Sequence, residues 1–94
     1  MRYTEILLTL GKDEAHSRIR KRVKAGRVKT TGEEIEYRTN SGLLLGTLSE
    51  TELPSGETGS KLRYRTSTIN SSLSHGRTTA KQLRNAVEKY RYSG

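Results

Sequence analysis

Large apolar side chains are scarce in this sequence, and that scarcity limits the chain to one thin core. Of its 94 residues, 18 are isoleucine, leucine or valine, and phenylalanine and tryptophan are absent. With a formal net charge of +8, this composition lies near the border at which chains stay disordered. We therefore expect a single domain, residues 1–94, of modest stability, with partner binding or self-association as a further source of folding free energy.

The composition also excludes several classes of site. No cysteine is present, which rules out disulfides, thiolate metal sites and a cysteine nucleophile. The apolar runs ILL and LLL are far shorter than the roughly 20 residues of a membrane span. The N-terminal stretch MRYTEILLTLGKDE lacks the apolar region of a signal peptide. We expect a cytoplasmic protein with no membrane contact and no cofactor.

The charges are sorted into blocks along the chain. Residues 1–15 carry two cations and three acids, and residues 16–29 carry seven cations and no acid. Residues 30–57 carry one cation and six acids, and residues 58–94 carry eight cations and one acid. Such sorting predicts either one strongly positive face, or a basic block that lies against the acidic block of the same chain or of a partner.

The most basic block is predicted to lie on a helix over residues 13–25 that stops at Gly26. At 100° per residue, Ala15, Ile19 and Val23 form one narrow apolar stripe. The lysines and arginines therefore occupy most of the remaining circumference and point to solvent.

Alternating apolar and polar residues predict an antiparallel sheet. In GEEIEYRT, Ile35 and Tyr37 alternate with glutamates, and in KLRYRTSTI, Leu62 and Tyr64 alternate with cations. The turn Asn40-Ser41-Gly42 suits a hairpin. The predicted strands cover residues 3–10, 32–39, 43–49 and 61–69, with a short basic connector before residue 32 and a long polar loop over residues 50–60.

A second helix is predicted near the end of the chain. Thr79 and Gln82 are spaced as a capping box, after a loop with the sequence NSSLSHGR. Ala80, Leu83 and Val87 recur at helical spacing and give this helix one buried face. Residues 91–94 are expected to fray. The order β-α-β-β-β-α predicts an α+β two-layer sandwich, an antiparallel sheet with two helices on one face.

Nucleic-acid binding is the function that the charge pattern favours. Arginine can grip a phosphate with two donors, and such contacts hold a backbone without reading its sequence. Tyr37 and Tyr64 are in phase with apolar neighbours, so we expect them in the core and not stacked on bases. The predicted nucleic-acid-binding residues are Arg18, Arg20, Lys21, Arg22, Lys24, Arg27, Lys29, Arg63, Arg65, Lys81 and Arg84.

The same charge pattern would also arise without a nucleic-acid ligand, in two ways. A helix needs solvated residues on its outer side, and lysine and arginine are good helix formers. Alternatively, the basic helix of one subunit engages the acidic hairpin of another, which would make the chain a homodimeric interaction module.

Catalysis is a less favoured alternative. His16 and His75 would have to act as acid and base, with Arg77 on the phosphate, as in a metal-independent ribonuclease. Nothing in the sequence shows that the two histidines meet. The glutamates of GEEIEYRT place at most two carboxylates on one strand face, so no metal site is expected.

Residues 13–90 resemble a known topology. A helix, three strands and a closing helix that opens with GRTTAKQLR resemble the α-β-β-β-α order of double-stranded-RNA-binding domains and of small toxin ribonucleases. The resemblance implies phosphate contacts at the start of the last helix, to which Arg77, Lys81 and Arg84 correspond. The N-terminal strand, the long loop and the missing lysine cluster depart from that pattern.

Overall fold

The fold is α+β, with a five-stranded antiparallel sheet and two helices. The computed structural model describes residues 3–23, 26–66 and 74–93, with side chains for all of these except 74–79. The elements in chain order are β1 (Tyr3–Leu8), α1 (Lys12–Arg22), β2 (Arg27–Thr31), β3 (Glu34–Arg38), β4 (Leu44–Glu52), β5 (Thr58–Arg65), α2 (Ser74–Val87) and a 3-10 turn, η2 (Glu88–Tyr90).

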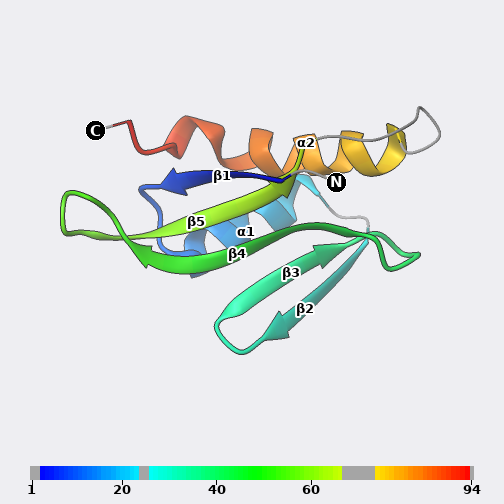
Figure 1. Cartoon of the computed structure of the whole chain (residues 1–94), viewed down its shortest axis with the longest axis horizontal. Coiled ribbons are helices and arrows are strands. Elements are labelled where there is room, and N and C mark those ends of the chain that lie inside the picture. The colour runs from blue at the N-terminus through cyan, green and yellow to red at the C-terminus, as the bar shows by residue number, and fades with distance from the viewer. Residues whose placement is uncertain (1–2, 24–25, 67–73, 94) are drawn as a thin grey trace.

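The strand order in the sheet is β1-β5-β4-β3-β2, so β1 and β2 lie at the two edges. All four pairings are antiparallel. In Figure 1, α1 lies behind β4 and β5, and the β2–β3 hairpin extends away from the helices. The β2–β3 hairpin is therefore the part of the sheet that the helices cover least.

One face of the sheet shares a core with both helices. Ile6, Leu62, Leu48 and Ile35 are aligned across β1, β5, β4 and β3, and all four are buried. The same core holds Ala15, Ile19 and Val23 from the first helical segment and Ala80, Leu83 and Val87 from the second, as the sequence predicts. The opposite face of the sheet carries most of its charged side chains, and we call it the open face.

The expected order of elements is wrong at one point, because the short basic connector is a strand. Residues Arg27–Thr31 form β2 and pair with β3. All five residues of β2 are exposed, and the sequence RVKTT lacks the alternation of apolar and polar residues from which a half-buried strand is predicted. The α-β-β-β-α order that carried the resemblance is also absent, since four strands separate the two helices.

The polar loop is also shorter than expected. β4 continues to Glu52 and β5 begins at Thr58, so strand pairing takes up most of residues 50–60. The turn between them needs Gly56, whose φ of 90° suits glycine. The end of the predicted strand over residues 61–69 lies partly outside the described residues.

The second helix and the tail differ from expectation as well. α2 begins at Ser74, so Thr79 lies inside the helix and is not its cap. Arg91 forms a bridge with Leu8, and the Tyr92 N–H donates to the carbonyl of Leu7 at 2.7 Å. The segment expected to fray thus pairs with β1. Within the described residues, neither helix has the length and apolar character needed to cross a membrane.

Candidate nucleic-acid interface

The sheet divides the predicted binding residues between two sides of the molecule. One group lies on the helices and the other on strands. Lys24 lies outside the described residues. The helix group contains Arg18, Arg20, Lys21, Arg22, Lys81 and Arg84, and the strand group contains Arg27, Lys29, Arg63 and Arg65.

Two residues near the end of the chain, Asn85 and Tyr90, contact cations of the helix group. The Arg22 Nη1 donates to the carbonyl of Asn85 at 3.1 Å, and the Arg84 Nη2 donates to the Asn85 Oδ1 at 3.1 Å. The Arg18 guanidinium lies 4.5 Å from the centre of the Tyr90 ring. Because Arg18 meets Tyr90 and Arg22 meets Asn85, α1 and α2 run antiparallel.

These contacts bring cations from distant parts of the sequence onto one surface. We call it the helix surface and define it as Arg18, Lys21, Arg22, Lys81 and Arg84. Lys21 projects from α1 away from its buried Ala15 and Ile19, and Lys81 precedes Asn85 by one helical turn. Lys21, Arg22 and Lys81 are all exposed.

Glutamates neutralise only part of the helix surface. Arg18 pairs with Glu14 at 3.4 Å, and Arg84 lies 3.8 Å from Glu88. Both pairs are one helical turn apart and partly exposed, so each contributes a fraction of a kcal/mol, about 0.3–0.5. Within the described part of the chain, no carboxylate lies in ion-pair distance of Lys21, Arg22 or Lys81.

The strand group lies in a region that holds both acids and cations. Arg63 is opposite Glu5 of β1 in the strand register, Lys29 is opposite Glu36, and Arg27 is opposite Arg38. Arg65 is 3% exposed and so is closed to an external ligand. The open face therefore has mixed charge, in contrast to the helix surface.

Arg20 faces a different environment from its neighbours on α1. Its Nη1 donates to the Val23 carbonyl at 3.1 Å, and its charge acts on His16 and Tyr37. The His16 Nδ1 lies 2.7 Å from the Tyr37 hydroxyl of β3. Burial, with a smaller effect of Arg20, lowers the pKa of His16, and burial raises the pKa of Tyr37. The lowered pKa favours the neutral form of His16 in the folded protein.

The two histidines of the ribonuclease hypothesis lie toward opposite ends of the helix pair. His16 precedes Arg18, which contacts Tyr90 beyond the end of α2, whereas position 75 is in the first turn of α2. The side chain of His75 is outside the described residues. The twelve helical steps of α2 from position 75 to Val87 span about 18 Å. The two histidine positions are therefore separated by most of the length of α2.

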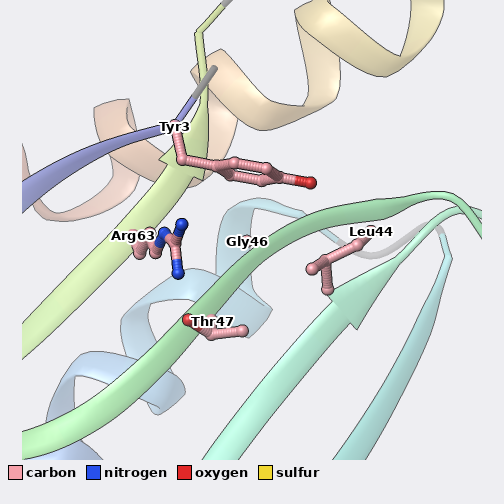
Figure 2. A pocket seen from close by; sticks show the side chains of 5 residues that line it. All are labelled: Tyr3, Leu44, Gly46, Thr47 and Arg63. Atoms are coloured by element: carbon pink, nitrogen blue, oxygen red, sulfur yellow. The ribbon is translucent and has the colours of Figure 1, made fainter. Parts of the chain in front are cut away.

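The open face contains a small hollow of about 220 Å³. Figure 2 shows the Tyr3 ring and Leu44 above and beside it, with Arg63 and Thr47 opposite. The Arg63 guanidinium lies 5.0 Å from the centre of the Tyr3 ring. Gly46 contributes only backbone to the lining of the hollow, and a side chain at this position would point toward Leu83 of α2 instead.

Sequence reasoning missed the residues that organise both surfaces. Asn85 and Tyr90 carry no charge, and only the packing of α1 on α2 gives them a role. Tyr3 falls in the predicted first strand, but its place beside Arg63 depends on the pairing of β1 with β5. Tyr37 and Tyr64 are buried, as expected from their periodicity.

Neither a metal site nor a known relative points to a function. Among the described residues, no group of three histidine, aspartate or glutamate side chains is placed to hold a metal ion. Comparison of the chain with protein-family models, with curated proteins and with solved structures found no match. The function must therefore be inferred from the geometry of the surfaces.

Proposed function

We propose that this protein binds nucleic acid through phosphate contacts on the helix surface. One observation carries the proposal: Asn85 accepts hydrogen bonds from both Arg22 and Arg84, so cations of α1 and α2 converge on one solvent-facing strip. In this proposal the domain is a two-layer unit with both helices on one face of the sheet. Arg27, Lys29 and Arg63 contribute only to the overall positive electrostatic potential of the protein.

The arrangement suits a phosphate backbone better than an isolated charge would. Arginine presents several donors in a fixed plane, and the hydrogen bond of Arg22 to Asn85 limits the orientations that its guanidinium samples. Five cations that each neutralise one phosphate predict a log–log salt slope of about −4.5 on duplex DNA. Such contacts do not read bases, so we expect weak sequence preference.

The proposal is tested by removing the same charge from the two sides of the sheet. The helix-surface variant is Lys21→Gln, Arg22→Gln and Lys81→Gln, and the control is Lys29→Gln, Lys61→Gln and Arg63→Gln. Fluorescence anisotropy with labelled duplex and single-stranded oligonucleotides is measured from 50 to 300 mM salt. We expect the helix variant to flatten the salt slope by about 2.7 and the control to change it by less than about one.

Two results would contradict the proposal. Equal losses in both variants would mean that only total charge matters, and absence of binding at 50 mM salt would remove the function altogether. Tyr3→Ala supplies a third comparison, because it removes the aromatic ring that lines the hollow without changing charge. A selective loss of single-strand affinity in Tyr3→Ala would move the interface to the open face.

A homodimeric interaction module is the second candidate function. It is favoured by the outer edge of β2, with which no other described strand pairs.

A further inference from the structure

The hollow on the open face follows from an irregularity in the pairing of β3 with β4. At this register shift, Leu45 is the residue of β4 that has no opposite residue in β3. Leu45 is 1% exposed and belongs to the core, and a Cβ atom at Gly46 would lie 3.1 Å from the Leu83 side chain. Two consecutive positions thus face the helices, which leaves a gap between Leu44 and Thr47 on the open face. Bulges of this kind are common next to functional sites.

The walls of the hollow combine an aromatic ring, an aliphatic side chain and a cation. Tyr3 of β1 and Leu44 of β4 supply the apolar side, and Arg63 of β5 lies opposite (Figure 2). The Arg63 guanidinium is 5.0 Å from the centre of the Tyr3 ring, which keeps this cation at the rim. The volume of about 220 Å³ is below the roughly 300 Å³ at which pockets for drug-sized ligands begin. The hollow therefore suits a small ligand.

The positive charge of Arg63 is not neutralised by a carboxylate. Within the described part of the chain, Arg63 forms no ion pair. Glu5, directly opposite Arg63 on β1, lies 3.9 Å from Lys61. Glu36, two strands away in the same row, lies 3.1 Å from Arg38. Because Arg63 is also exposed, its guanidinium can donate to an anion at the hollow with several N–H groups in one plane.

We propose that the hollow is a binding site for a small molecule that combines one planar ring with one anionic group. The ring packs against Tyr3 and Leu44, and the anionic group accepts hydrogen bonds from the Arg63 guanidinium. A phosphate and a carboxylate both meet this requirement, so a mononucleotide and an aromatic acid are two sources of the same chemistry. The site uses no residue of the helix surface, so it is independent of nucleic-acid binding.

NMR titration of the isotope-labelled chain tests the site, because backbone amide signals report separately on the two surfaces. The probes are adenosine monophosphate and benzoate, and their controls are adenosine and benzamide, which keep the ring and lack the anion. We expect at least one probe to shift the amides of Gly46 and Thr47, and its control to bind about tenfold more weakly. The probe that binds more tightly identifies the preferred anion.

Three results of this titration would overturn the proposal. The first is the absence of shifts at Gly46 and Thr47 with both probes at about 10 mM. The second is equal binding of each probe and its uncharged control. The third is a set of shifts confined to Lys21, Arg22 and Lys81, which would place the anion on the helix surface.

Two matched pairs of variants test the residues themselves. Arg63→Gln should weaken binding of the probe about tenfold, whereas Lys29→Gln removes the same charge from the same face and should leave binding within about twofold. Thr47→Trp fills the hollow and should abolish binding, whereas Ser49→Trp adds the same ring two residues further along β4 and should not.

Circular dichroism verifies that each variant is folded. If Thr47→Trp is unfolded, the comparison of Arg63→Gln with Lys29→Gln decides alone. Equal effects of the two members of a folded pair would overturn the proposal. Nucleic-acid binding is measured with oligonucleotides and the helix-surface variant, so either proposal can fail alone.

Discussion

β1 and β2 are both edge strands of one sheet, but they stand in opposite relations to the rest of the molecule. β1 buries Ile6 and Leu8 against the helices, and its outer edge is bonded by the segment from Tyr90 to Tyr92. No residue of β2 is fully buried, and Val28, at 37% exposed, is its only large apolar side chain. The difference shows that edge strands can be held by a core or by pairing alone.

The two edges also differ in what an added strand would meet. At β1 the chain has already used the backbone groups around Leu7 and Thr9, so a partner strand would have to displace residues near Tyr92. At β2 no described segment has to be displaced, and Arg27 and Lys29 keep uncontrolled pairing in check. Among the described residues, the β2 edge is therefore unpaired on its outer side but carries two cations that disfavour the addition of an arbitrary strand.

The largest expected effect contrasts an apolar residue from each edge strand. Leu8→Ala removes a side chain that is 0% exposed and should lower the free energy of unfolding by about 2–5 kcal/mol. Val28→Ala should lower it by less, about 1 kcal/mol or under, because more than a third of the Val28 surface is exposed. Urea unfolding followed by circular dichroism measures both. Similar losses in the two variants would mean that β2 is packed as firmly as β1.

A smaller effect is expected from the bond that closes the β1 edge. Tyr92→Pro removes the N–H that donates to Leu7, and Tyr92→Ala removes the ring but keeps that donor. We expect the proline variant to be less stable than the alanine variant by about 1 kcal/mol in the same urea titration. Equal stability of the two variants would mean that the tail does not hold this edge.

An effect of similar size concerns how α1 holds the β2–β3 hairpin. Tyr37→Phe removes the hydroxyl that bonds His16 and should cost about 1 kcal/mol, with faster amide exchange in β2 and β3 than in β1. Uniform exchange across the sheet would show that the hairpin does not depend on this bond.

The burial of His16 predicts a pH dependence. Because the pKa of His16 is lowered in the folded state, the unfolded chain binds a proton first as pH falls through 6.5. The contribution of His16 to stability is therefore complete above pH 6.5 and declines below it. In His16→Gln, the unfolding free energy should depend less on pH between about pH 7.5 and 5.5. An unchanged pH dependence would show that His16 is not its source.

Periodicity predicted the parts of the fold that bury apolar side chains. Ala15 and Ile19 on α1, Leu83 on α2, and Ile35 and Leu62 in the sheet all lie in the core as expected. β2 could not be predicted in this way, because RVKTT is exposed on both faces and becomes a strand through its pairing with β3. The tail was missed for the same reason, since its order comes from bonds to β1.

The sequence by itself determined the composition of the core, the outward position of Lys21 and Arg22 on α1 and the mixed charge of the sheet. These properties follow from local spacing, which sets the face of a helix or strand on which a side chain lies. Only the tertiary structure decided that Arg22 and Arg84 meet at Asn85, that Arg65 is buried, and that one sheet edge is closed and the other open. Those outcomes depend on which elements pack together, and contacts between residues more than sixty positions apart are not encoded in any local pattern.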